Sequence, residues 1–319
     1  MLLSFSSEFR PAGLLLLALT LAACGGSGND HDDVGGGDGG PGGEVPDGTT
    51  LLIDTDNAAA VLVHARLALE ILPRLQRNAN ILVSQGLNGT PTCDNPDGVF
   101  QLTEDDQGAP AEAVFEDCVD PLYPSRAFDG RIVFDFTDPN RPYSAFSNYR
   151  NRINSSSSFS QEWSLSGGFS IRPEDAGNAF GNAVIADANV ISNYTLSTDH
   201  GSVMVGYRFQ DFEVLFDSTI SNLSQPLPTL AGGGRLFLFN DAAEGWVRVS
   251  TPHRLTDPLP GNGFCYGNGE LVVDGAASSR VQLDYSGADL MISVNGVTVI
   301  SGECEALLES LMAQAGLAI

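Results

Sequence analysis

Three carboxylates stand beside aromatic residues in stretches that are predicted to be β-strands. Glu162 precedes Trp163, and Asp211 and Glu213 flank Phe212. An aromatic surface beside carboxylates can bind sugars, and a pair of carboxylates is the acid and base of a glycoside hydrolase. Strand alternation alone gives the same pattern, because outward carboxylates then alternate with inward aromatic rings. We favour alternation and predict no catalytic residue.

The histidines of the predicted folded region show no metal-binding spacing. His64, His200 and His253 are far apart, and no two of them form a zinc-hydrolase motif. The Gly-x-Ser-x-Gly elbow of the α/β-hydrolases is also missing from the sequence. We therefore expect a chain that is not an enzyme and holds no metal or cofactor. His64 falls within a predicted helix, where we expect a packed or hydrogen-bonded core residue.

The N-terminal segment has the three parts of a secretory signal. Arg10 precedes an apolar run over residues 14–21, and small residues follow up to Cys24. The tetrapeptide Leu-Ala-Ala-Cys that ends at Cys24 resembles the lipobox of bacterial lipoproteins. The resemblance implies that the Cys24 thiol receives a diacylglycerol, that residues 1–23 are removed, and that the new amino terminus is acylated, for example with palmitate.

The same resemblance implies a location and a membrane contact through the acyl chains. Gly25 follows the cysteine, whereas an Asp there retains Gram-negative lipoproteins in the inner membrane. We therefore expect the outer membrane, at its periplasmic face or at the cell surface. Residues 24–49 are rich in Gly and Asp and have few apolar residues to bury, so we predict a disordered tether.

Four cysteines remain once lipidation has used Cys24. An even number of cysteines in an exported protein is typical of disulfides, and three pairings are open. We favour Cys93–Cys118 and Cys265–Cys304, because each pair brackets its own set of predicted strands. A four-thiolate zinc site is the alternative, but the sequence lacks the close Cys-x-x-Cys pairs of such sites.

The composition is acidic and free of lysine. The net charge is −25, from 40 acidic residues and 15 basic residues that are all arginine. Such a surface repels nucleic acid and anionic lipid, so we exclude DNA-binding, RNA-binding and polybasic membrane roles. Two origins stay open: a host with high genomic GC, whose codons favour arginine, and a salt-adapted host, whose proteins need a hydrated carboxylate surface.

One stretch has a strong helical pattern. Residues 57–72 are rich in Ala, Leu and Val, and Thr55 or Asp56 can cap the start. Its polar stripe from Arg66 onward is narrow, so we expect an apolar helix that is buried on most sides. Pro73 then ends or kinks it. A second, short helix is predicted over residues 305–315.

The rest of the chain is predicted to be β-structure. About eleven strands, joined by turn signals such as Asp-Gly, Ser-Gly and Asn-Gly, follow one another without intervening helices. They cover residues 98–103, 113–118, 131–136, 159–171, 183–196, 203–216, 235–239, 245–250, 271–274, 280–285 and 290–294, with 297–300 returning toward Cys304.

This order predicts a mainly β fold. Residues 50–319 are expected to form a single domain, in which a large curved antiparallel sheet packs on the N-terminal apolar helix. A two-sheet sandwich is the alternative. For function we expect a lipid-anchored, non-catalytic binding or scaffold module of the envelope, whose partner is a protein, glycan or apolar ligand. The first alternative is a carrier of an apolar ligand in a sheet cavity, and the less favoured second alternative is a carbohydrate-active enzyme.

Overall fold

The structure is a computed structural model, and it describes ten ranges of the chain. These are residues 49–87, 93–120, 124–138, 142–156, 159–174, 181–198, 201–217, 227–240, 243–259 and 264–317. The predicted signal peptide and almost all of the predicted tether lie outside the described residues, as does His200.

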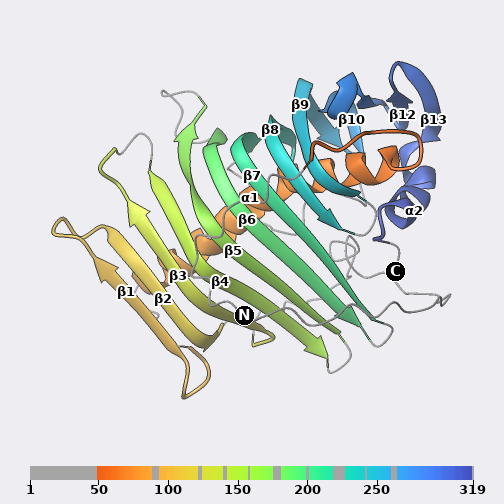
Figure 1. Ribbon diagram of the computed structural model, residues 1–319. Coiled ribbons are helices and arrows are strands. Elements are labelled where there is room, and N and C mark those ends of the chain that lie inside the picture. The colour runs from red at the N-terminus through yellow and green to blue at the C-terminus, as the bar shows by residue number, and fades with distance from the viewer. Residues whose placement is uncertain are drawn as a thin grey trace, which may run out of the picture.

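Within these ranges, thirteen strands form one open antiparallel sheet, and each strand pairs with its neighbours in sequence (Figure 1). The mainly β, antiparallel prediction is confirmed, while the two-sheet alternative is wrong. The strands are β1 (Val99–Glu104), β2 (Pro110–Val119), β3 (Arg126–Asp135), β4 (Tyr143–Ser156), β5 (Phe159–Pro173), β6 (Asn182–Thr198), β7 (Gly201–Asp217), β8 (Thr229–Asn240), β9 (Ala243–Pro258), β10 (Tyr266–Asp274), β11 (Arg280–Ser286), β12 (Asp289–Val294) and β13 (Val297–Glu303).

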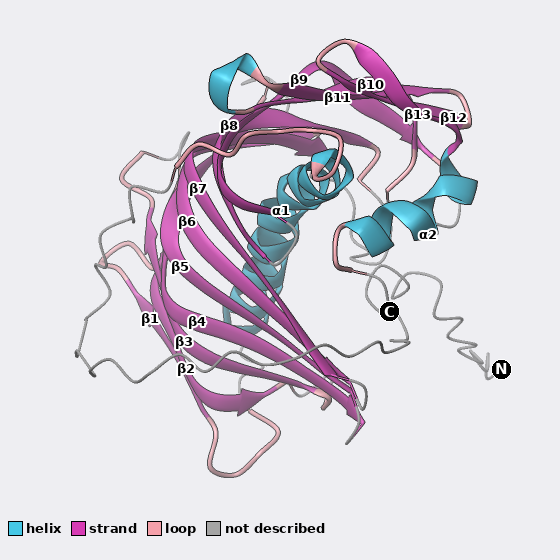
Figure 2. Ribbon diagram, turned by 45° about the vertical axis from the view of Figure 1, so that its right-hand side comes forward, coloured by secondary structure: helices cyan, strands magenta, loops and turns pink. Residues whose placement is uncertain are grey.

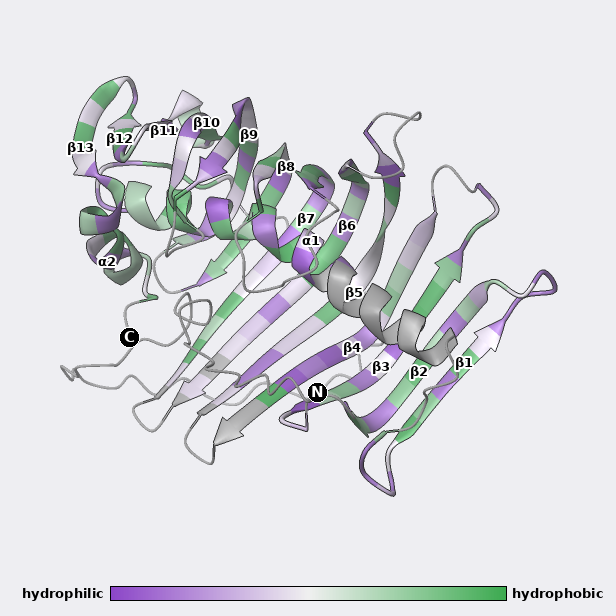
Figure 3. Ribbon diagram, turned by 180° about the vertical axis from the view of Figure 1, so that it is seen from behind, coloured by the Kyte–Doolittle hydropathy of each residue, from purple (hydrophilic) through white to green (hydrophobic). Residues whose placement is uncertain are grey.

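The sheet curls around helix α1 (Ala58–Leu87) (Figure 2). We call the face that carries α1 the inner face, seen in Figure 3, and the opposite one the outer face, seen in Figure 1. A register shift occurs in every strand pairing from β1/β2 to β9/β10. Because a bulge bends its strand and increases the local twist, this line of bulges accounts for the curl.

The bulges place Asx residues and glycines opposite each other. Asp211 in β7 has a φ of 49°, in the left-handed region that Asp tolerates better than most residues. On β8, Gly234 has a φ of 146°, and a Cβ added there would lie 2.6 Å from the Asp211 carbonyl oxygen. Only glycine fits this close approach. Asp117 on β2, Asn148 on β4 and Asp187 on β6 are also left-handed.

Helix α1 starts close to the predicted position but with a different cap. The Asp54 carboxylate accepts hydrogen bonds from the backbone N–H groups of Asp56 (2.9 Å) and Asn57 (3.2 Å). Asp54 therefore caps the helix, instead of Thr55 or Asp56, because its oxygen reaches the free N–H groups of the first turn. The helix also continues past Pro73, so tertiary packing outweighs the one hydrogen bond that proline removes.

The buried face of α1 is not purely apolar, in contrast to the prediction. Leu62, Leu69 and Leu72 join the single large core with the inner face of the sheet, but His64, Arg66 and Glu70 are buried there as well. No helix in the described part of the chain is long and apolar enough to cross a membrane. The second predicted helix is present as α2 (Cys304–Gln314), which packs against α1 and β13 (Figure 2).

Candidate functional site

The structure separates the three predicted carboxylates from their aromatic neighbours. Trp163 and Phe212 pack into the inner core, while Glu162, Asp211 and Glu213 lie on the solvent side of the sheet. Glu162 lies 4.0 Å from Arg150, and Glu213 forms an ion pair with Arg172 at 2.8 Å. The alternation explanation is confirmed, because the rings do not share a face with the carboxylates. The bulge at Asp211 also explains how Phe209 and Phe212 both point inward.

Glu213 belongs to a depression on the outer face of β5 to β9, which we call the outer depression. Its volume is about 560 Å³. Four small or aliphatic residues form a separate apolar cluster in and beside its floor, on the side of the sheet away from the main core: Val184, Ala186, Leu215 and Ala231. Apolar side chains on an outer sheet face are unusual, since that face normally carries polar residues.

Two ion pairs frame this floor. Arg172 from β5 pairs with Glu213 from β7, and Arg254 from β9 pairs with Glu174, which follows β5. Asn182 adds a hydrogen bond from its side-chain amide to Glu174 (3.1 Å). Each ion pair joins strands that are not neighbours in the sheet, so the side chains are held across the floor. The rim therefore offers fixed groups of both charges around an apolar surface.

The backbone at the edge of the outer depression is also fixed in place. The Thr251 hydroxyl accepts a hydrogen bond from the Gly232 N–H (2.7 Å) and donates one to the Gly232 carbonyl (3.2 Å). These bonds satisfy the backbone N–H and C=O groups of Gly232 at the point where the β8/β9 register shifts and the normal hydrogen-bond ladder is interrupted. Hydrogen bonds and ion pairs thus order both the strand and the rim side chains of the outer depression, which lowers the ordering cost of binding.

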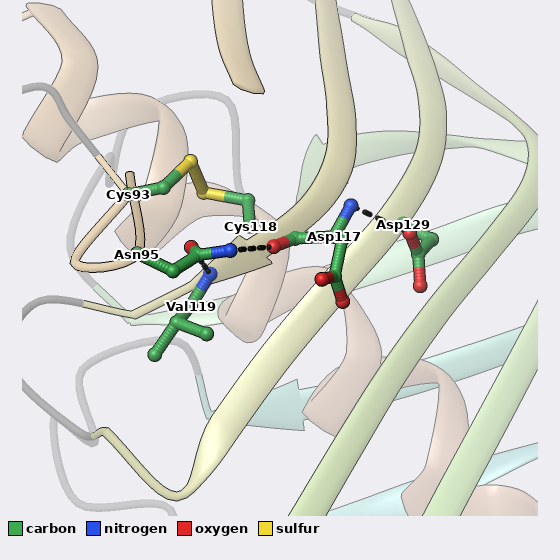
Figure 4. Close-up of a disulfide and its surroundings, with 6 residues drawn as sticks. All are labelled: Cys93, Asn95, Asp117, Cys118, Val119 and Asp129. Carbon is green, nitrogen blue, oxygen red and sulfur yellow. Dashed lines mark hydrogen bonds between the residues drawn. A yellow bond between two sulfur atoms is a disulfide. The ribbon is translucent and has the colours of Figure 1, made fainter. Parts of the chain in front are cut away.

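Both predicted disulfides are confirmed. Cys93–Cys118 joins the segment before β1 to β2, and Cys265–Cys304 joins the start of β10 to the start of α2. Figure 4 shows the first disulfide beside Asn95, which donates to the Asp117 carbonyl (2.8 Å) and accepts from the Val119 N–H (3.0 Å). These bonds brace the bulge in β2, so we assign this corner a structural role.

The left-handed Asp117 is held by groups from two further strands. Its N–H donates to the Asp129 carboxylate (2.7 Å), a contact drawn in Figure 4. Arg152 from β4 then bridges the Asp117 and Asp129 carboxylates, at 2.9 and 2.7 Å. One guanidinium between two carboxylates reduces their mutual repulsion and links them, which supports a bracing role across β2, β3 and β4.

A second group of polar residues lies in the core between α1 and the sheet. His64 donates from Nε2 to the Ala315 carbonyl (2.9 Å), since that oxygen only accepts, and Nδ1 therefore accepts from the Tyr207 hydroxyl (2.8 Å). Burial lowers the pKa of His64 to about 4, although the bond to Ala315 opposes this shift. The expectation of a hydrogen-bonded core histidine is confirmed.

Arg66 and Glu70 form a buried ion pair with an N–O distance of 2.7 Å. Burial alone would lower the pKa of Arg66, but the Glu70 carboxylate raises it overall. Burial would likewise raise the pKa of Glu70, but Arg66 and Arg74 lower it. The guanidinium carbon of Arg66 also lies 4.8 Å from the centre of the Tyr266 ring, a cation–π distance. Both residues stay charged inside the core.

Other predicted site residues can be placed only in part. Cys24 lies outside the described residues. His253 is largely exposed and lies 3.6 Å from Glu270. Among the residues that the structure describes, no three His, Cys, Asp or Glu side chains are placed to hold a metal ion. No known protein family, no curated protein and no solved structure matches this chain.

The outer depression was not predicted from the sequence. Glu213 was considered as a catalytic candidate, but its partner Arg172 lies 41 positions away, and Arg254 and Glu174 are 80 positions apart. The sequence carries one signal: residues 183–186, directly after the first residue of β6, are Ala-Val-Ile-Ala, so apolar residues occupy both faces of the strand there. A run of apolar residues at the start of an otherwise alternating strand indicates a second buried surface.

Proposed function

We propose that this chain is a lipid-anchored protein of the cell envelope that binds a partner through the outer depression and catalyses no reaction. Lipidation at Cys24, and with it attachment to the outer membrane, is inferred from the resemblance to the lipobox. The observation that carries the binding role is an apolar floor on an outer sheet face, framed by two ion pairs.

The chemistry of the outer depression favours recognition over catalysis. The rim carboxylates, Glu174 and Glu213, each contact a guanidinium, and so present fixed acceptors beside fixed donors. A ligand with an apolar body and polar groups of both kinds, such as a segment of an envelope protein, complements this surface. A volume of about 560 Å³ is in the range of ordinary ligand sites.

A carrier of an apolar ligand is the second candidate. A helix lying in the concave face of a curved sheet supports it by fold analogy alone (Figure 2). The packing of the first half of α1 argues against a ligand cavity there, because Val61, Leu62 and Leu69 are fully buried against the sheet. A ligand between α1 and this part of the sheet would have to displace those side chains, which makes the outer depression the stronger site.

Photocrosslinking in cells tests the binding role. A photoreactive amino acid replaces Leu215 in the floor, and a matched variant carries it at Val133, an exposed aliphatic residue of β3 outside the depression. We expect a discrete adduct from position 215 that is absent at position 133. The adduct should be lost when Arg254→Glu reverses the charge of one rim residue.

Two results would contradict the binding role. One is an equal set of adducts from both positions, which would indicate random encounters at the surface. The other is an adduct from position 215 that persists unchanged in the Arg254→Glu background, which would indicate contact without recognition by the rim.

A further inference from the structure

A second outer-face surface lies next to the outer depression, over β7, β8 and β9. We call it the arginine patch, and its members alternate along the strands with residues of the inner core. They are Met204, Arg208, Arg235, Phe237, Phe239 and Arg248. Met204 and Phe239 are 55% and 45% exposed, which is high for large apolar side chains. Arg208 faces Phe237 across β7 and β8, so cations and apolar side chains are interleaved.

The three arginines of the patch differ from most of the other arginines whose side chains the structure describes. Within the described ranges, Arg208 and Arg248 have no carboxylate within 4.0 Å, and Arg235 contacts Gln210 and the face of the Trp246 ring. Ion pairs with carboxylates are present for most of the other arginines whose side chains are described, namely Arg66, Arg74, Arg131, Arg150, Arg152, Arg172, Arg254 and Arg280. In a chain with 40 acidic residues, cations without carboxylate partners are exceptions. Such cations are available to bind an anion from outside the chain.

The register makes an anion at this position more favourable. Arg235 on β8 stands directly opposite Arg248 on β9. Like charges that face each other across two strands destabilise the pair, and an anion bound between them removes this cost. On β10, Asp274 faces Arg248, but it forms its own ion pair with Arg280 (2.6 Å). Glu244, an exposed carboxylate, stands opposite Phe239 at the edge of the patch.

The chain that leads from Cys24 enters the fold beside this patch. The Leu51 N–H donates to the Trp246 carbonyl (2.9 Å), and the Trp246 N–H donates to the Thr49 carbonyl (3.2 Å). Trp246 itself lies under Arg235. Residues 24–48 therefore connect the expected acyl chains to a point at the rim of the patch. Fully extended, they reach at most about 90 Å, so the tether confines the patch to a limited distance from the bilayer.

We propose that the arginine patch docks onto a glycerophospholipid surface. The inference rests on the proposed lipid anchor. Arg208, Arg235 and Arg248 bind headgroup phosphates, while Met204 and Phe239 enter the interfacial layer. The net charge of −25 does not prevent this contact, because charges farther than about 8 Å are screened at physiological salt. Since the tether keeps the local concentration high, a weak contact is sufficient to orient the domain.

Docking by this face has a consequence for the proposed binding role. Arg248 precedes Ser250, which lines the outer depression, so the two surfaces adjoin along β9. A domain docked by the patch holds the outer depression at the bilayer surface. The partner is then a protein or lipid-linked molecule that lies in the same membrane.

Quenching of Trp246 fluorescence by brominated lipids tests the docking. The acylated full chain with Trp163→Phe keeps Trp246 as its single tryptophan. It is reconstituted in vesicles of phosphatidylcholine and phosphatidylglycerol whose acyl chains carry bromine. Co-flotation and intact mass first establish that the chain is acylated and bound. The patch variant combines Arg208→Ser with Arg248→Ser, which leaves the contact between Arg235 and Trp246 in place.

The matched control combines Arg131→Ser with Arg150→Ser, two exposed arginines outside the patch whose loss changes the net charge equally. We expect Trp246 to be quenched in the parent and control, and the equilibrium constant for docking to fall about 25-fold in the patch variant, at about fivefold per arginine. Vesicles of phosphatidylcholine alone should give weaker quenching. Phe239→Ser should reduce quenching without any change in charge.

Several outcomes would overturn the docking while leaving the anchor intact. They are an acylated, vesicle-bound parent without quenching, and equal quenching in the patch and control variants. A third is a dimer in detergent that becomes a monomer only in the patch variant, since the occupant is then a second copy. A chain without acyl groups would instead refute the proposed anchor, and adding it to preformed brominated vesicles would still test the patch.

Discussion

Protonation of His64 should lower the stability of this fold. His64 is fully buried, and its neutral form is fixed by hydrogen bonds to the Tyr207 hydroxyl and the Ala315 carbonyl. Burial lowers its pKa from 6.5 to about 4 in the folded state. The unfolded chain therefore binds more protons than the folded chain between these two pH values, and stability must fall as the pH falls through this window.

The size of the effect follows from the two pKa values. One pKa unit corresponds to about 1.4 kcal/mol, so the free energy of unfolding should drop by about 2 kcal/mol between neutral pH and pH 5. The loss should reach about 3 kcal/mol near pH 4. Because Ala315 follows the last turn of α2, protonation of His64 should also loosen the docking of α2 on α1.

Urea unfolding followed by tryptophan fluorescence, at several values between about pH 7 and pH 5, measures this slope. Carboxylates of the unfolded chain titrate mostly below this window, so His64 dominates it. The double variant His64→Leu with Tyr207→Phe removes both partners of one hydrogen bond. It should be less stable at neutral pH but nearly independent of pH in the window.

His253→Gln is the control, because His253 is largely exposed and should leave the slope unchanged. A parent protein with constant stability between neutral pH and pH 5 would refute the reasoning. A slope that survives in the double variant would refute it equally, since another group would then carry the proton uptake.

Three further variants test the packing by urea or thermal unfolding. Gly234→Ala should cost about 1–3 kcal/mol, because its Cβ would collide with the neighbouring strand at a strained φ, and an unchanged midpoint would contradict this. Glu70→Gln should lower the free energy of unfolding by about 3–5 kcal/mol, because it leaves Arg66 charged and without its partner Glu70 in the core. The double variant Arg66→Met with Glu70→Leu should lower it by less. If the double variant were the less stable of the two, the ion pair itself would be stabilising. Cys265→Ser with Cys304→Ser should cost about 2–5 kcal/mol, and a smaller loss would mean that α2 is held mainly by its packing.

Much of the strand order could be predicted from the sequence, because turn residues and alternation mark it. The hairpin of β8 and β9 shows this, since the predicted strands 235–239 and 245–250 do pair, although the pairing extends to Asn240 and Ala243 and the turn is shorter than predicted. The strand β4 was not predicted. Its bulge at Asn148 interrupts the alternation between Phe146 and Tyr149, and its second half is polar, with Asn151 buried.

The two outer-face surfaces could not be predicted from the sequence, because they depend on how the strands pair. The outer depression and the arginine patch combine residues from strands far apart in sequence, and their contacts depend on the register of those strands. Arg235 and Arg248 look like ordinary surface cations until their pairing is known. Net charge also misleads here, because a chain of charge −25 still places Arg208, Arg235 and Arg248, which have no carboxylate within 4.0 Å among the described residues, on one face of the sheet. The bulges had one local sign, the spacing of three between the buried rings of Phe209 and Phe212.

The intact mass of the mature, detergent-extracted protein, before and after reduction, tests the central claim most directly. We predict a chain that begins at Cys24 and carries acyl groups, and whose mass rises on reduction by two hydrogens for each of the two disulfides. A mature chain without acyl groups would contradict the anchor, and with it the membrane-bound setting proposed for the outer depression and the arginine patch.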